Sequence, residues 1–421
     1  MNKILSVLIL KIISFQAFSQ TYERTDNKVY DADIKTVQFY AFGNGAQMPG
    51  LSSRVLSLNN NDRMVLEFDD LSGSYRQFHV KIQHCNLDWT ESRLSELEYL
   101  TEFNDFIIND YQISQNTKIP YFHYGFILPE LKISGNYTLL LYEDYLSDAP
   151  LASLQFSVVN PLVGISGNIQ TAQDPALWQS HEQINFELNY GNYQVSNPRN
   201  DFQIFIRQNY RGETTRTNFK ATSVNAGTRT LAYRFFNNEN TFPAGNEFRY
   251  VDLRSNFNKG GNIAEIQQGY EDNIWLVPQK TRSEKTYLEA VDLNGRFVIQ
   301  TLDGDEPSIN ADYMHVHAAF LTDKINNSDK ICLLGGFNQF DCDNGGELFF
   351  NPEIDAYETT FLLKQGMYDF QFALVDASGK SNFAVFEGDF SSTRNSYEIF
   401  VYHKPPGAKS ELLVGYTVIE E

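Results

Sequence analysis

Short apolar and aromatic runs, each about five to nine residues long, recur along almost the whole chain. Gly, Asn, Asp and Pro separate them. The segment FHVKIQHC at Phe78–Cys85 alternates apolar and polar positions, which is typical of a strand with one buried face. Helical periodicity is nearly absent, and one short helix is predicted over Glu91–Leu100 with Thr90 as its cap. The pattern therefore predicts an all-β protein.

The runs fall into three series. Asn160-Pro161 ends the first series, and the polar, turn-prone segment Pro278–Arg282 ends the second. Their regular spacing predicts three consecutive β-sandwich domains of immunoglobulin-like or early-set-like type. The expected division is a signal peptide at 1–19, an N-terminal sandwich at 20–160, a middle sandwich at 161–282 and a C-terminal early-set-like sandwich at 283–421.

The first residues have the pattern of an export signal. Lys3 gives a positive start, an apolar run follows, and Ala17-Phe18-Ser19 is a small-x-small ending that places cleavage after Ser19. The run is too short and too interrupted for a permanent anchor, and no later segment approaches the roughly 18 uninterrupted apolar residues of a membrane helix. We expect an exported, soluble mature protein that does not insert into the membrane.

Composition and charge exclude some partners. Apolar residues make up 42% and aromatic residues 14% of the 421 positions, which is enough to build several cores. The formal net charge of −20 becomes −22 when Lys3 and Lys11 leave with the signal peptide. Such a chain repels phosphate backbones and anionic lipid, so nucleic acid is not an expected partner.

No known catalytic motif occurs in the sequence. It has no Gly-x-Ser-x-Gly elbow, no phosphate-binding glycine loop and no His-Glu-x-x-His. We therefore do not expect a serine hydrolase or a metalloprotease, and a small-molecule ligand is not an expected partner.

Metal sites are also not expected. His315 and His317 lie on one face of a predicted strand, but no third ligand is identifiable, so polar positions on the solvated face are the preferred interpretation. Asp69-Asp70 precedes turn residues and is interpreted as part of a turn. The acidic loops Asp303–Glu306 and Asp341–Gly345 each resemble only half of a calcium loop.

The three cysteines do not form a disulfide-rich scaffold. Cys85 ends an alternating strand and is interpreted as a small buried hydrophobe. A bridge between Cys332 and Cys342 is compatible with their spacing, but spacing alone does not establish it.

Aromatic residues are most concentrated within the block Arg63–Glu143, and many of them lie between predicted strands. They either form a satellite core beneath a loop or an exposed recognition surface, because aromatics concentrate at protein interfaces and sugar sites. The candidate partner-binding residues are Trp89, Tyr99, Phe103, Phe106, Tyr111, Tyr121, Phe122 and Tyr124.

Several segments resemble one known family. In the first third these are IKTVQFY at Ile34–Tyr40, LEFDDL at Leu66–Leu71, QHCNLDW at Gln83–Trp89, SRLSELEYL at Ser92–Leu100, NDYQISQNT at Asn109–Thr117, YFHYGFILP at Tyr121–Pro129 and SGNYTLLLYE at Ser134–Glu143. Near the C-terminus they are Tyr357–Asp376 and Asn395–Gly407. They resemble the plug proteins of the Bacteroidota type IX secretion system. The middle unit, Ile165 to Pro278, carries little of the resemblance.

The resemblance implies a periplasmic protein with no enzymatic activity and no cofactor, associated with the outer membrane through its partner. That partner is the very large outer-membrane β-barrel translocon, whose periplasmic opening the plug occludes in the absence of cargo. An alternative comes from ICLLGGFNQF at Ile331–Phe340, which is similar to early-set modules that bind starch and glycogen. Those modules stack sugars on tryptophan, whereas this chain has Phe340 near that position. A periplasmic or surface glycan-binding protein using loop aromatics is therefore the second hypothesis.

Overall fold

The computed structural model describes residues 27–43, 50–58, 60, 62–144, 146–147, 149–325 and 328–420. The expected signal peptide at 1–19 lies outside the described residues. Strand accounts for 45% and helix for 8% of the structure, so the predicted all-β sandwich class is confirmed.

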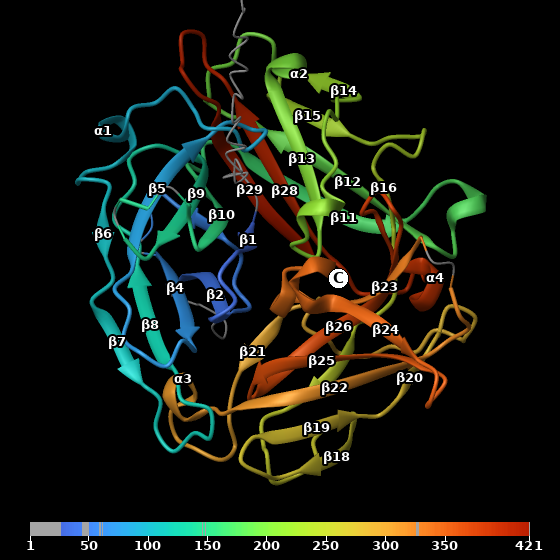
Figure 1. Cartoon of the computed structure of the whole chain (residues 1–421). Helices are drawn as coiled ribbons and strands as arrows, with labels where there is room; N and C mark the ends of the chain where they lie inside the picture. Colours follow the sequence, from blue (N-terminus) through green and yellow to red (C-terminus); the bar gives the residue numbers. More distant parts are fainter. Residues whose placement is uncertain are drawn as a thin grey trace, which may run out of the picture.

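The first sandwich is built from two sheets that enclose one core (Figure 1). Alternating side chains such as Val80 and Ile82 point into that core, as the sequence pattern predicts. One sheet contains β1 Lys28–Val29, β3 Val55–Ser57, β5 His79–Cys85, β6 Phe106–Ile107, β9 Gly135–Tyr142 and β10 Ala152–Val159. The other contains β2 Ile34–Phe42, β4 Arg63–Asp70, β7 Asp110–Ile113 and β8 Phe122–Ile127.

The helix in this sandwich is shorter than predicted. α1 covers only Glu96–Tyr99, and Ser95 precedes it, with the Ser95 backbone N–H donating to Glu98 at 2.8 Å. Thr90, the expected cap, instead hydrogen-bonds with Asp88 in the turn that follows β5. The prediction of a helix from Glu91 was therefore wrong, because Glu91 forms an isolated β-bridge with Cys85 and the Ser92 N–H donates to the His84 carbonyl.

The middle sandwich combines strands from two distant parts of the chain. Its first sheet contains β11 Gly164–Thr171, β12 His181–Asn189, β14 Ser223–Asn225, β15 Thr230–Tyr233 and β16 Thr241–Pro243. Its second contains β13 Phe202–Gln208, β28 Ser396–His403 and β29 Leu412–Glu420. Figure 1 shows the two red C-terminal strands beside the green β13. The core of the middle sandwich draws on both parts of the chain.

The remaining strands form an inserted sandwich, which lies in the chain between β16 and β28. They form one 11-stranded curled sheet around their own core. Its strands are β17 Arg249–Asp252, β18 Ile263–Gln267, β19 Asp272–Leu276, β20 Gln279–Lys280, β21 Phe297–Ile299, β22 Tyr313–Leu321, β23 Lys330–Leu334, β24 Glu347–Asn351, β25 Ala356–Lys364, β26 Gly366–Val375 and β27 Ser381–Asn382. Short helices and turns are α2 Pro198–Asp201, α3 Pro307–Asn310, α4 Ala384–Glu387, η1 Pro175–Leu177, η2 Gly212–Thr214, η3 Gly336–Asn338 and η4 Cys342–Gly346.

Strand pairing crosses the domain boundary expected at residues 282 and 283. β17 lies before that boundary and pairs with β26, which lies after it. β28 also lies after it and pairs with β13, which lies before it. We therefore propose a division by sheet membership, in which the inserted sandwich interrupts the middle one.

Candidate functional site

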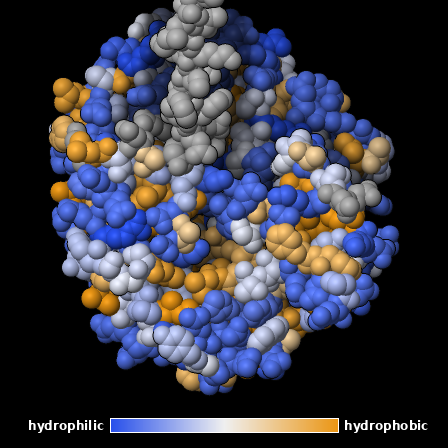
Figure 2. All heavy atoms as spheres, viewed as in Figure 1, coloured by the Kyte–Doolittle hydropathy of each residue, from blue (hydrophilic) through white to orange (hydrophobic). Residues whose placement is uncertain are grey.

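The outer edge of the first sandwich is the most exposed part of the aromatic-rich segment. β6 and β7 are edge strands of the two sheets, and all four residues of β7 are exposed. Figure 1 places both strands at the left side of the molecule, and Figure 2 shows orange apolar side chains among blue polar ones along that side. An exposed edge strand offers backbone groups as well as side chains to a partner.

Four apolar side chains on β6, on β7 and in the loop that precedes β6 are exposed, and we name them the exposed strip: Phe103, Ile107, Tyr111 and Ile113. Phe103 is 70% and Ile113 56% exposed. The Tyr111 ring also packs 4.8 Å from the ring of Tyr75, which is itself exposed. Apolar and aromatic side chains grouped on a monomer surface mark an interaction site more often than isolated ones do.

The structure divides the eight predicted partner-binding residues into four groups. Phe103 and Tyr111 are exposed, whereas Phe106 and Phe122 are partly buried and pack against the first core. Buried are Tyr99, Tyr121 and Tyr124. Trp89 lines a cavity between the three sandwiches.

The three buried tyrosines have intramolecular roles, so they are not part of a contact surface. The hydroxyl of Tyr99 donates to the Ile82 carbonyl at 3.1 Å, and that of Tyr124 donates to the Arg76 carbonyl at 2.7 Å. Tyr121 does lie at an interface, but an internal one, since its hydroxyl donates to the Ala311 carbonyl of the inserted sandwich at 2.8 Å. Ile107 and Ile113 are aliphatic, so the concentration of aromatic residues in the sequence did not point to them.

The loop between β7 and β8 fixes the first sandwich to the inserted one. Lys118 Nζ lies 2.5 Å from a carboxylate oxygen of Asp272, and the Lys118 and Ile119 backbone N–H groups donate to Asp312. Burial raises the pKa of Asp312, and these backbone hydrogen bonds oppose that shift. These contacts fix the loop to the inserted sandwich, while Gln115 and Asn116 remain exposed.

A buried ion pair lies beside this loop. Lys364 Nζ is 2.7 Å from Asp69 Oδ2, and the Tyr313 hydroxyl donates to the same oxygen at 2.6 Å. His123 lies 2.8 Å from the other Asp69 oxygen. Burial lowers the pKa of Lys364, and the Asp69 carboxylate opposes that shift. The interpretation of Asp69 as a turn residue was therefore wrong, although its neighbour Asp70 accepts hydrogen bonds from Ser72 in a turn.

A mainly apolar joint connects the first and middle sandwiches. Val159 packs in one cluster with Phe400, Tyr402 and Leu413. The Tyr402 hydroxyl also donates to the Asn136 side chain at 2.7 Å, and both residues are buried. This packing, the contacts of Lys118 and the Asp69–Lys364 ion pair together hold the three sandwiches in contact.

The histidine pair has ordinary hydrogen-bond partners. His315 Nε2 lies 2.6 Å from Glu271, and His317 Nε2 lies 2.8 Å from Asn273. Met314 and Val316 are buried on the other side of β22, as expected for a strand with one solvated face.

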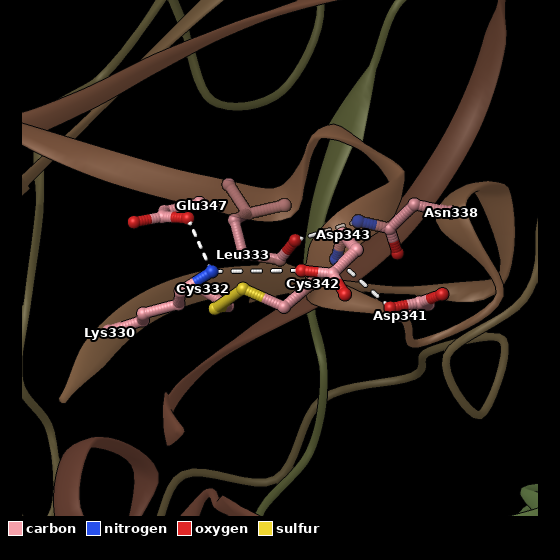
Figure 3. The surroundings of a disulfide bond; sticks show 8 residues. All are labelled: Lys330, Cys332, Leu333, Asn338, Asp341, Cys342, Asp343 and Glu347. Atoms are coloured by element: carbon pink, nitrogen blue, oxygen red, sulfur yellow. Dashed lines mark hydrogen bonds and ion pairs between the residues drawn. A yellow bond between two sulfur atoms is a disulfide. The ribbon is translucent and has the colours of Figure 1, made fainter. Parts of the chain in front are cut away.

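Internal hydrogen bonds and one disulfide hold the two acidic loops in their conformations. Asp303 accepts from Asn256 and Gln365. Figure 3 shows the second loop, where Asp341 accepts from the Asp343 backbone N–H and Lys330 lies near Asp343. Within the described residues, no group of three His, Cys, Asp or Glu side chains is placed to hold a metal ion.

The structure pairs Cys332 with Cys342 in a disulfide, whose Cα atoms are 5.6 Å apart. Figure 3 shows the bond between β23 and the acidic loop. Cys85 is a buried free cysteine, as predicted.

Comparison with known proteins identifies the family. A family model described as the first domain of the type 9 secretion system plug protein matches residues 34–160, most of the first sandwich. The chain belongs to the type 9 secretion system plug family. The predicted membership is thus confirmed, and with it a role as a component of type IX secretion.

A solved structure shares the fold over most of the chain. It is described as the crystal structure of a hypothetical protein from Parabacteroides merdae ATCC 43184. The two are 31% identical with a TM-score of 0.86, and the match covers 93% of this chain and 98% of that chain. No curated protein matches this chain.

Plug-family membership associates the protein with the secretion system and its components. The family is one of secretion components rather than of known enzymes. No helix among the residues described by the structure has the length and apolar character needed to cross a membrane.

Proposed function

We propose that the protein binds the very large outer-membrane β-barrel translocon of type IX secretion and occludes its periplasmic opening when no cargo is passing. It acts in the periplasm, without catalysis or cofactor, and reaches the outer membrane through this partner. The observation that carries the proposal is the match of the plug-family model to the first sandwich, the same unit that presents the exposed strip.

The joints between the sandwiches support a steric mechanism. The Asp69–Lys364 ion pair joins the first sandwich to the inserted one, and the cluster around Phe400 and Leu413 joins the first to the middle one. An obstacle built from three connected sandwiches excludes cargo from an opening that it occupies. Durable closure requires an interface on the order of 1,200 Å² or more.

The exposed strip is the proposed centre of that interface. Phe103 and Tyr111 supply aromatic area with few rotatable bonds, a combination enriched at binding hot spots. The free edge of β7 adds backbone donors and acceptors, which a strand or extended segment of the barrel protein can pair with. Binding through these contacts must remain reversible, so that cargo can displace the plug.

Affinity purification tests the proposal. The tagged protein, expressed in its native cells, is expected to recover a very large outer-membrane barrel protein. Phe103→Asp combined with Tyr111→Asp is expected to reduce this recovery at least tenfold in a protein that still folds, because both side chains are exposed. A small fall in the melting temperature is expected, since the contact between the Tyr111 and Tyr75 rings is lost. Phe106 is unsuitable for this test because it packs against the core.

Tyr270→Asp is the matched control, because Tyr270 is 89% exposed and lies between β18 and β19 of the inserted sandwich. This variant is expected to recover the barrel as well as the wild type does. Absence of a barrel protein from the wild-type sample would refute barrel binding. Equal losses in the strip variant and the control would refute the strip as its centre. Retention of the wild type on immobilised α-glucan would favour the alternative of sugar binding.

A further inference from the structure

A cavity of about 330 Å³ lies where the three sandwiches meet. The first sandwich contributes Arg54 and Trp89 to its wall, the middle sandwich Arg207 and Arg211, and the inserted sandwich Arg296 and others. The volume lies within the range of small-molecule sites. In a chain with a net charge of −20, four arginines around one cavity form a local concentration of positive charge.

Two of these arginines are neutralised within the protein. Arg207 forms an ion pair with Glu398, with 2.6 Å between Nε and the carboxylate, and Arg211 forms one with Glu213 at 2.7 Å. These pairs account for the charge of Arg207 and Arg211 without a ligand.

The other two arginines contact no carboxylate in the described part of the chain. Arg54 donates to the Phe39 carbonyl and, at 2.7 Å, to the Asn27 side chain, whereas Arg296 donates to the carbonyls of Leu51 and Leu293. Burial and the nearby charge of Arg207 lower the pKa of Arg54 to about 10. An anion in the cavity would relieve this repulsion.

Two glutamines on the wall have unused hydrogen-bonding atoms. Gln38 is 8% exposed, and its Nε2 has no hydrogen-bond partner within the described structure. The buried Oε1 of Gln339 also lacks one there. Buried polar atoms are nearly always paired, and leaving one unpaired costs stability. The wall therefore offers a donor to an anion and an acceptor to an N–H or O–H group.

Strained backbone is concentrated around the same cavity. Among the described residues, thirteen other than glycine have positive φ, and five of these line the cavity. They are Trp89 (φ 64°), Asn209 (50°), Tyr210 (61°), Gln339 (57°) and Phe340 (57°). Bulky residues rarely adopt this conformation, and such strain tends to occur at ligand sites.

We propose that this cavity binds a small organic oxyanion, a carboxylate or phosphate on a carbon body that also carries an N–H or O–H group. Arg54, Arg296 and Gln38 bind the oxyanion, and Gln339 accepts from the donor group. Trp89 and Phe340 contribute aromatic surface next to the carbon body. The site is independent of barrel binding and would connect all three sandwiches through one ligand.

Calorimetric titration of the purified full chain tests the site. N-acetylglutamate, galacturonate, glycerol 3-phosphate and inorganic phosphate serve as probes in chloride buffer at matched pH and ionic strength. At least one organic probe is expected to bind one per chain, and more tightly than inorganic phosphate. The comparison of carboxylates with glycerol 3-phosphate identifies the oxyanion.

Two variants separate binding from folding. Arg54→Met is expected to weaken binding at least tenfold, because it removes a charge that has no carboxylate partner in the described structure. Gln38→Met is expected to weaken binding at least threefold and to raise the melting temperature without ligand, because it removes an unpaired buried donor. Arg234→Met, at an exposed arginine paired with Glu187, is the control and should bind as the wild type does.

Lack of binding by all four probes would overturn the proposal. So would unchanged affinity in both cavity variants, or a Gln38→Met protein that is less stable than the wild type and binds as well. If Arg54→Met does not fold, Gln38→Met alone decides the outcome. None of these results depends on the barrel interaction.

Discussion

Lys364 and Asp69 form a buried ion pair across the joint between the inserted and first sandwiches, with 2.7 Å between Nζ and Oδ2. Each side chain is only 1% exposed. Removal of one partner leaves a charge without its counter-ion in a region that water does not reach. The joint is therefore sensitive to single substitutions.

Lys364→Met and Asp69→Asn are each expected to destabilise the protein by about 3–5 kcal/mol. The double variant is expected to recover much of this loss, because no isolated charge remains. Urea unfolding of the four proteins forms a double-mutant cycle that measures the coupling. Additive losses would show that the two residues act independently.

Asp369 gives the stability a pH dependence. Burial, followed by the nearby carboxylate of Asp292, raises the pKa of Asp369 to about 8, whereas an unfolded aspartate titrates near 4. Between these values the folded state holds a proton that the unfolded state has released. The stabilising contribution is therefore complete below about pH 4 and is lost as the pH rises through about 8.

Asp369→Asn resembles the protonated side chain at every pH. As the pH rises from 5 to 8, we expect the unfolding free energy of this variant to rise by about 1–3 kcal/mol relative to that of the wild type. Urea titrations at both pH values measure the change. Asp323→Asn, at an exposed carboxylate, is the control. A difference between Asp369→Asn and the wild type that does not vary with pH would contradict the prediction.

His84 is expected to make the first sandwich sensitive to acid. Burial lowers the pKa of His84 to about 4, whereas the unfolded side chain titrates near 6.5. As the pH falls through this interval, the unfolded state binds a proton that the folded state does not, so stability decreases. When the pH falls from 7 to 4.5, the unfolding free energy of His84→Met is expected to decrease by about 1–3 kcal/mol less than that of the wild type.

Thermal or urea unfolding at the two pH values checks this difference. His315→Gln is the matched control, because His315 is partly exposed and pairs with Glu271. Equal acid sensitivity in His84→Met and the wild type would show that other groups dominate.

The disulfide between Cys332 and Cys342 closes a loop with a sequence separation of 10. Loop-closure entropy predicts a loss of about 2–3 kcal/mol when the bridge is removed. A reducing agent should therefore lower the melting temperature of the wild type and not that of the Cys332→Ala/Cys342→Ala double variant. Cys85→Ala retains the bridge and should respond to reduction as the wild type does. Three free thiols in the untreated protein would contradict the bridge.

Local sequence patterns predicted the strands, whereas they left the pairing of the strands undetermined. The alternation in Phe78–Cys85 places Val80 and Ile82 in the core, because strand period and burial are both local properties. The pairing of β13 with β28 depends on residues about 190 positions apart, for which a single sequence contains no signal.

The aromatic residues show a second limit. Tyr111 and Tyr124 are cross-strand partners between β7 and β8, yet the first is exposed and the second buried. Both side chains lie on the same face of the sheet, and they differ because β7 is the edge strand whereas β8 has a neighbour on each side, which composition does not encode. The arginines of the cavity come from three separate units, so no motif indicates that site.

The position of the inserted sandwich in the chain constrains the order of folding. Five buried core residues of the middle sandwich, Tyr397, Ile399, Val401, Val414 and Ile419, lie on its last two strands. The middle sandwich therefore remains incomplete until the C-terminus has been synthesised, whereas the first sandwich needs only the chain up to about residue 160. During biogenesis, β11 to β16 would present an unfinished apolar surface throughout synthesis of the insert, a natural binding site for a holding chaperone.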